Sequence, residues 1–247
     1  MRILFIVILF VHGLIHFMGF AKAFDFGNMA QFTKEISKPV GFLWLLTSLL
    51  FIVSGVLYLI KKETWPMLAI IAVILSQILI FMVWKDAKFG TIANVIILLV
   101  GIVGFGHYQF HKMVRGESKQ LLRNIQVENL PIISKKAIDH LPEIVQKWMR
   151  NSGVIGKEKI VSVRLEQKGE MKTKPEGKWM TFTARQYFNV EPPAFIWTTD
   201  VDFMPMVNMA GRDKLIDGKG EMLVKLANVI PVVDEGNNEK INSGAML

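Results

Sequence analysis

Two histidines, His12 and His16, lie in the first long apolar segment of this 247-residue chain. Their spacing of four places both imidazoles on one face of a helix, and Gly19 and Ala23 continue that face. Ionisable side chains are costly in the hydrocarbon core of a bilayer and usually mark a function there. Two chemistries suit the pair: hydrogen bonding between helices, or a proton, quinone or haem site in which histidine is the ligand or proton carrier.

Other polar side chains fall at the level of these histidines. At a rise of about 1.5 Å per residue, His12 and His16 lie about 14 and 20 Å along the first segment, and Gln77 lies about 17 Å along the third. Thr47 and Ser48, in the second segment, reach a similar level from the opposite direction. The sequence therefore predicts one polar layer near the midplane, formed by His12, His16, Thr47, Ser48 and Gln77.

His107 and His111 repeat the same spacing near the end of the fourth apolar segment. They lie about 10–15 Å from the level of the first pair, and two ligands of one haem iron must share a level. We therefore expect an interfacial, structural role for both.

Asp200 and Asp202 are two residues apart on a predicted strand, so they share its wet face. Paired carboxylates can bind a cation or do acid–base work, but without a third placed ligand a solvated face is expected. No Ser/His/Asp arrangement, phosphate loop or zinc spacing is present, and the absence of cysteine excludes disulfides and thiolate chemistry. The sequence predicts no catalytic residue, metal or cofactor, and it favours a non-enzymatic role.

Four apolar segments position the histidines. Each approaches the length of about 20 residues that a helix needs to cross a bilayer, and they cover residues 3–20, 40–60, 66–84 and 90–110. They predict a membrane-embedded all-α four-helix bundle over residues 1–110. The remaining residues, 111–247, lack such a segment and predict a soluble α+β domain.

The distribution of cationic residues indicates an orientation. Seven Lys/Arg lie near the span ends on the side of the N-terminus and five on the other side, which favours a multi-pass cell-membrane protein with both termini in the cytoplasm. The net charge of +8 is shared equally by residues 1–110 and 111–247. We interpret it as attraction to anionic lipid headgroups and not as a nucleic-acid site.

The C-terminal part changes from helical to alternating patterns. Helices are predicted over residues 113–126 and 142–149, the second carrying Trp148. Alternating strands follow over residues 161–166, 180–190, 195–203 and 221–226, separated by turn residues, and they predict an antiparallel meander with one apolar and one wet face.

The apolar face of this meander is rich in aromatic residues: Phe182, Phe195, Trp197 and Phe203. These side chains would either pack against the helix of Trp148 or line a groove for a lipid-like ligand. Residues 242–247 read as the beginning of a helix, and four strands leave an open edge. We therefore expect a longer protein, or a protein partner, to complete the sheet.

Several stretches resemble an uncharacterised bacterial membrane-protein family. Residues 12–24 (HGLIHFMGFAKAF), 37–41 (SKPVG) and 86–94 (DAKFGTIAN) resemble its membrane half. Residues 141–143 (LPE), 186–188 (QYF), 192–197 (PPAFIW), 211–213 (GRD) and 217–220 (DGKG) resemble its domain of unknown function. The resemblance implies further strands beyond residue 247 and no assigned activity.

Three functions fit these observations. The first is a membrane protein that binds a lipid-like or other apolar ligand through its aromatic sheet face. The second is a membrane redox or proton-handling protein that uses His12 and His16. The third is a scaffold whose open sheet edge recruits another subunit.

Overall fold

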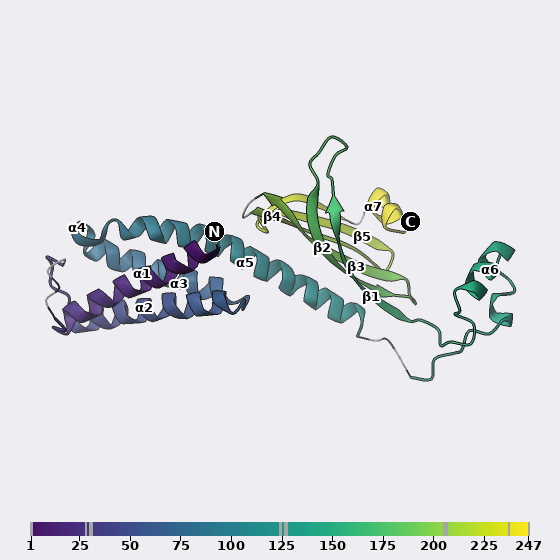
Figure 1. Cartoon of the computed structure of the whole chain (residues 1–247), viewed down its shortest axis with the longest axis horizontal. Coiled ribbons are helices and arrows are strands. Elements are labelled where there is room, and N and C mark those ends of the chain that lie inside the picture. Colours follow the sequence, from purple (N-terminus) through teal and green to yellow (C-terminus); the bar gives the residue numbers. More distant parts are fainter. Residues whose placement is uncertain are drawn as a thin grey trace. The chain divides into compact units, whose positions relative to one another are not determined.

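The computed structural model describes residues 2–27, 29, 32–123, 125, 128–204, 207–236 and 238–246. It divides into two compact units (Figure 1). The bundle unit comprises residues 1–111 and 227–229, and the sheet unit comprises residues 112–226 and 230–247.

Four long helices confirm the predicted helical N-terminal part. They are α1 (Arg2–Ala23), α2 (Lys38–Leu59), α3 (Trp65–Met82) and α5 (Gly90–Leu121), with the short α4 (Trp84–Ala87) before α5. All four are long and apolar enough to cross a membrane. Proline stands at the start of α2 and of α3, where its missing N–H removes no helical hydrogen bond.

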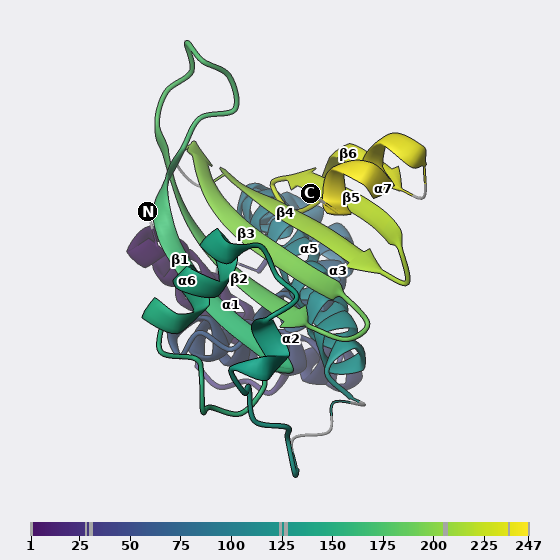
Figure 2. The same cartoon turned by 90° about the vertical axis from the view of Figure 1, so that its right-hand side faces the viewer.

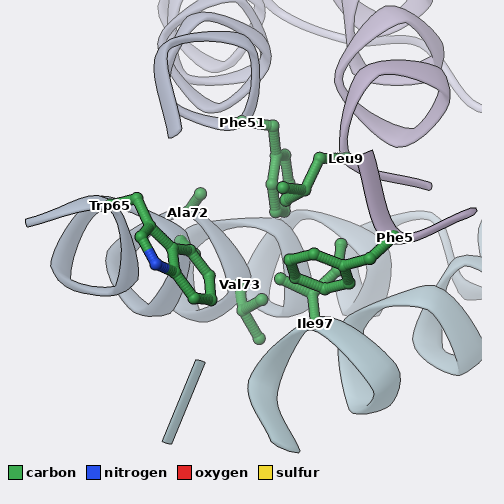
Figure 3. Close-up of a cluster of buried hydrophobic side chains, with 8 residues drawn as sticks. Phe5, Leu9, Phe51, Trp65, Ala72, Val73 and Ile97 are labelled. Atoms are coloured by element: carbon green, nitrogen blue, oxygen red, sulfur yellow. The ribbon is translucent and has the colours of Figure 1, made fainter. Parts of the chain in front are cut away.

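An apolar cluster joins the four long helices (Figure 3). It includes Phe5 and Leu9 of α1, Phe51 of α2, Trp65 of α3 and Ile97 of α5. The outward surface is also apolar: it exposes the side chains of Ile3, Ile92 and Leu99, among others. An outer surface of the bundle that is as apolar as its interior is stable in a bilayer, where lipid tails cover it.

Glycines allow α1 and α2 to approach closely. A Cβ on Gly19 would overlap the indole ring of Trp44, and a Cβ on Gly13 would lie 3.2 Å from Phe51 Cβ and from the carbonyl oxygen of Ser48. Small residues at such a crossing are typical of helix packing in membranes. Gly19 thereby leaves the space in which the Trp44 ring lies against α1.

The sheet unit contains a six-stranded antiparallel meander in the order β1-β2-β3-β4-β5-β6 (Figure 2). Its strands are β1 (Ser162–Met171), β2 (Met180–Asn189), β3 (Ala194–Met204), β4 (Val207–Ile216), β5 (Lys219–Leu226) and β6 (Ile230–Gly236). The meander is as predicted, but β4 and β6 are additional to the four expected strands. Gly211 and Asp213 in β4 and Pro231 in β6 are poor strand residues, and pairing with neighbouring strands outweighs that preference.

Three helical segments accompany the sheet. A 3-10 turn, η1 (Lys136–Ile138), precedes α6 (Glu143–Asn151), and α7 (Glu239–Met246) packs against β4, β5 and β6. The helix predicted over residues 113–126 is the end of α5, which stops at Leu121. Its last predicted residue, Gln126, and Leu247 of the predicted terminal helix lie outside the described residues.

Of the two alternatives for the aromatic face, packing against the helix of Trp148, which is α6, is wrong. Trp148 is 67% exposed, and α6 has no buried residue. The predicted division into a dry and a wet face also needs correction. Thr198 pairs with Arg212 and Arg212 with Leu223, so these residues share the face predicted to be wet.

That face is nevertheless buried at Ile196, Arg212 and Leu223. The reason is that Glu117, near the end of α5, forms ion pairs with Arg212 and Lys214. A charged sheet face can therefore be covered by a helix that carries the opposite charge.

Candidate functional site

A cavity of about 330 Å³ lies inside the bundle unit. It lies where the second half of α1, the beginning of α2, the end of α3 and the beginning of α5 meet, with α4 and the α1–α2 loop at its rim. Its lining includes His12, His16, Phe32, Trp44, Asp86 and Gly90. The cavity has the volume of a small-molecule site, and most of its walls are apolar.

His12 is fixed by a buried hydrogen-bond network that joins α1, α3 and α5. Its Nε2 lies 2.9 Å from Asn94 Oδ1, which also accepts a hydrogen bond from the Ser76 hydroxyl at 2.9 Å. The Asn94 amide nitrogen donates to Gln77 Oε1 at 3.0 Å, and Gln77 Nε2 donates to the Thr91 hydroxyl at 3.2 Å. Because Asn94 Oδ1 can only accept, His12 carries its proton on Nε2.

His16 has the opposite tautomer. Its Nδ1 lies 2.9 Å from the backbone carbonyl oxygen of His12. A carbonyl can only accept, so Nδ1 carries the proton and Nε2 has a free lone pair. The residue is 1% exposed, and His16 Nε2 is buried without a hydrogen-bond partner among the residues that the structure describes. A buried acceptor without a donor costs about 1–3 kcal/mol, and this one belongs to a side chain that lines the cavity.

Trp44 presents a second unsatisfied group. The residue is 2% exposed, and its indole Nε1–H, which can only donate, has no partner in the described part of the chain. Its ring lies 5.0 Å from the His16 ring, centroid to centroid. Phe32 packs edge-on against Trp44 at 5.5 Å and closes one wall of the cavity.

The α1–α2 loop is attached to α4 by Asp86. The carboxylate accepts hydrogen bonds from the backbone N–H and the hydroxyl of Thr33, both at 2.9 Å, and Lys34 Nζ donates to the carbonyl oxygen of Met82 at 3.0 Å. Desolvation works to raise the pKa of Asp86, but hydrogen bonds from Thr33 and Lys34 and the charge of Lys85 lower it below the ordinary value. Asp86 therefore stays ionised, with both oxygens engaged.

The predicted polar layer is only partly one cluster. His12 and Gln77 share the network through Asn94, and His16 adjoins His12, with ring centroids 4.6 Å apart. Thr47 donates to the carbonyl oxygen of Leu43 in its own helix at 2.8 Å. Ser48 is buried where α2 meets α1.

Sequence reasoning missed Asn94, Trp44, Phe32 and Asp86 as parts of this site. Asn94 gave a usable signal, because a polar amide inside an apolar segment needs a partner in the same way as a histidine does. Trp44 and Phe32 gave none, since aromatic residues are common in any apolar segment. Their roles follow from where the loop and α2 place them.

The aromatic residues predicted to bind a ligand lie in the sheet unit. Phe182 pairs with Val201 across β2 and β3, so Phe182, Phe195 and Trp197 share one face, which is half-buried. Trp197 Nε1 donates to Gln167 Oε1 at 2.9 Å. Phe203 is 38% exposed and lies at an irregularity in the pairing between Asp202 and Met204.

The other two predicted pairs, His107 with His111 and Asp200 with Asp202, are not among the residues that line the cavity. His107 and His111 are adjacent in α5, with ring centroids 4.2 Å apart. Asp202, expected to be solvated, is exposed and accepts a hydrogen bond from the Thr181 hydroxyl at 2.6 Å. Asp200 is half-buried.

A charged cluster lies on the opposite face of the sheet. Arg212 contacts Glu117 at 2.5 Å and Glu221 at 2.9 Å, and Lys214 contacts both carboxylates at 2.9 Å. Burial works to raise the pKa of Glu221, but Lys214 and Arg212 lower it by hydrogen bonding and charge. Two cations and two anions balance, so the cluster joins α5 to the sheet and offers no excess charge to a ligand.

Comparison with known proteins gives a family match for the C-terminal region and no activity. No curated protein and no solved structure matches this chain. The C-terminal region, residues 131–247, matches the model of a family of unknown function, DUF6544, and so fits an uncharacterised family.

Proposed function

We propose that this chain is a multi-pass membrane protein that binds a small, uncharged, lipid-like molecule in the cavity of its bundle unit. The observation that carries the proposal is the cavity of about 330 Å³ inside the bundle unit, which has mostly apolar walls and includes His12, His16 and Trp44 in its lining. A pocket of this size that combines apolar walls with a few polar side chains is typical of a small-molecule site. The four apolar helices support the membrane location, and the excess of Lys/Arg near the N-terminal side supports cytoplasmic termini.

The charge of the lining supports an uncharged ligand. Among the described residues of the lining, Asp86 alone is charged, and both of its oxygens already accept hydrogen bonds from Thr33. A charged ligand would therefore enter a low-dielectric site without a counter-ion, which is costly. An apolar body with one polar group meets no such penalty.

The test is to identify what the protein carries. The full chain is purified in detergent, and bound molecules are extracted into organic solvent and identified by mass spectrometry. Ala93 lines the cavity, so Ala93→Phe fills it and is expected to lose the bound molecule. Ile92→Phe is the matched control, because Ile92 is 62% exposed on the outside of the bundle. Equal molecular content in the wild type and Ala93→Phe would refute the proposal.

The same preparation tests the redox and proton-handling hypothesis for His12 and His16. A Soret band lost in His16→Leu would make the occupant a haem with His16 as ligand. Extracted quinone lost in that variant would instead identify a quinone site. A colourless protein without quinone would remove this hypothesis and leave a non-redox ligand.

A second candidate is lipid binding on the aromatic face of the sheet. Phe182, Phe195 and Trp197 share a half-buried face, and Leu165 and Met222 add side chains that are 40% and 36% exposed. An apolar surface of this kind is typical of a binding face. Trp197→Ala is expected to lower the lipid that co-purifies, and an unchanged lipid content would count against this candidate.

The scaffold hypothesis depends on the outer strands. Strands β1 and β6 are the two ends of the strand order, and a free strand edge can pair with another chain. A partner that is lost when Leu165, in β1, is replaced by proline would support recruitment at that edge. A monodisperse monomer would argue against it.

A further inference from the structure

Helix α6 of the sheet unit exposes two large apolar side chains on one face. Ile144 and Trp148 are 74% and 67% exposed, and their spacing of four makes them neighbours on the helix surface. The helix has no buried residue, and it lies apart from the strands of its own unit (Figure 1). Adjacent apolar side chains that a protein leaves uncovered usually mark an interaction surface.

The segment that carries α6 is closed on itself. Ile132 and Glu158 form an antiparallel bridge, and the backbone N–H of Lys159 donates to the carbonyl oxygen of Pro131 at 2.8 Å. Inside this segment Ile138 is 2% exposed and forms a small core. The segment therefore holds α6 in place without using its apolar face, which is left for another surface.

The charge around α6 suits an anionic surface. Residues 132–160 contain six Lys/Arg and three Asp/Glu, an excess of three positive charges. Lys135, Lys136, Lys147 and Arg150 are all exposed. Exposed apolar side chains beside cationic ones are typical of helices that lie in the headgroup region of a bilayer, and tryptophan is enriched at that level.

The chain is long enough for α6 to reach the membrane from α5. Helix α5 has 32 residues, so it is about 48 Å long and extends beyond the roughly 30 Å hydrocarbon core. Residues 122–142 connect the end of α5 to α6, and an extended segment of that length spans about 70 Å. This reach exceeds the part of α5 that extends beyond the core.

We propose that α6 docks on the anionic lipid headgroups of the membrane that holds the bundle, with Ile144 and Trp148 inserted and the cationic residues beside the phosphates. This inference rests on the proposed membrane location and not on the cavity. With nine residues, α6 offers little apolar surface to a bilayer. The four apolar helices compensate, because a tethered helix meets the headgroups at a high effective concentration.

The experiment places a reporter on each face of α6. The chain contains no cysteine, so one introduced cysteine takes a single polarity-sensitive nitrobenzoxadiazole label. Ile144→Cys places the label on the apolar face, and Glu143→Cys is the matched control on the polar face. The full chain is reconstituted in nanodiscs of phosphatidylcholine, alone or mixed with phosphatidylglycerol, with and without a spin-labelled lipid that quenches fluorescence inside the bilayer.

We expect the label at position 144 to shift its emission to shorter wavelength in the anionic discs and to be quenched there by the spin-labelled lipid. The label at position 143 is expected to keep its emission in both kinds of disc. Added salt should reverse the shift at position 144, because it screens attraction between exposed charges.

Charge variants in the Ile144→Cys background test the cationic residues. Each cation near an anionic surface strengthens docking about fivefold, so Lys147→Gln is expected to lower the ratio of docked to free α6 about fivefold as the fraction of anionic lipid is varied. Lys168→Gln is the matched control, since it removes an exposed charge from β1. Equal effects of the two substitutions would contradict a role for α6.

The outcomes distinguish this inference from the membrane location. A label at position 144 that stays in water in both kinds of disc refutes docking and leaves the bundle as a membrane anchor. A label that is shielded in every disc but not quenched by the spin-labelled lipid refutes it also, because protein then covers α6. A chain that does not incorporate into discs refutes the membrane location, and docking fails with it.

Discussion

At the scale of single residues, the interior of the bundle contains buried polar atoms that differ in whether they form hydrogen bonds. Asn94 is 2% exposed and uses both ends of its amide, accepting from His12 and Ser76 and donating to Gln77. Among the described residues, none donates a hydrogen bond to His16 Nε2. The contrast is informative, because a satisfied amide stabilises the fold, whereas a buried acceptor without a donor lowers its stability.

Replacement of Asn94 tests this network. Asn94→Leu is similar in size but leaves His12, Ser76 and Gln77 without their partner. With three contacts of about 0.6 kcal/mol each, we expect a loss of about 2 kcal/mol in the free energy of unfolding. Thermal unfolding in detergent measures the change. Thr47→Val is the control, since among the described residues Thr47 donates its hydroxyl hydrogen bond within its own helix. An equal loss in both variants would contradict the assignment.

The pKa of Glu221 gives a pH prediction at the same scale. Its folded-state pKa is lowered, because Lys214 and Arg212 outweigh the opposing effect of burial. A lowered pKa means stability that is present above the ordinary glutamate range and is lost as the pH falls through the depressed pKa. We therefore expect the melting temperature of the wild type to exceed that of Glu221→Gln at neutral pH. The difference should shrink on acidification, and a difference independent of pH would contradict the assignment.

At the scale of elements, the crossing of α1 and α2 depends on the absence of side chains. A Cβ on Gly19 would overlap the Trp44 ring, whereas a Cβ on Gly116 of α5 would meet no atom within 4 Å. The two glycines therefore have different effects on their helices. Gly19 makes room for a ring that lines the cavity, whereas Gly116 only lowers the helix propensity of an exposed turn.

The matched pair Gly19→Ala and Gly116→Ala tests this difference. In an exposed helix, alanine is better than glycine by up to about 1 kcal/mol, so Gly116→Ala is expected to raise the melting temperature slightly. Gly19→Ala must displace Trp44 or separate α1 from α2, so it is expected to lower the melting temperature and to reduce the amount of bound molecule that the purified protein carries. A gain in stability from both substitutions would show that the α1–α2 contact is looser than the structure indicates.

At the scale of the whole molecule, four long apolar helices precede a charged sheet unit. The exposed side chains of the bundle are apolar on its outer surface, and large apolar surfaces of this kind are not tolerated in water. Helix α5 has 32 residues, so it is about 48 Å long, longer than the roughly 30 Å hydrocarbon core. The last residues of α5, from Lys112, belong to the sheet unit.

Extraction tests the membrane assignment. The full chain is expected to remain in the membrane fraction through high-salt and alkaline washes, because neither treatment offsets the burial of four apolar helices in lipid. Detergent should release it. Gel filtration and immunoblotting of each fraction measure the distribution, and recovery of the intact chain as a dispersed species without detergent would contradict the assignment.

Hydropathy and alternation made much of the fold predictable. Each apolar segment forms its own backbone hydrogen bonds, so its helix follows from local composition. Strands with clean alternation, such as β2, were also found. The strands β4 and β6 were not, because Gly211, Asp213 and Pro231 hide a pattern that neighbouring strands impose. One of the two alternatives for the aromatic face, packing against the helix of Trp148, was wrong, since a sequence does not say which surface an apolar helix face will meet.

The sequence by itself determined the four apolar helices, the antiparallel meander and the pairing of His12 with His16 on one helical face, because all three depend on spacing along the chain. Only the tertiary structure decided that Asn94 satisfies His12, that His16 and Trp44 line one cavity, and that the end of α5 covers the charged face of the sheet. These facts depend on which residues far apart in sequence are brought within hydrogen-bonding distance. That is set by packing between elements and not by periodicity within them.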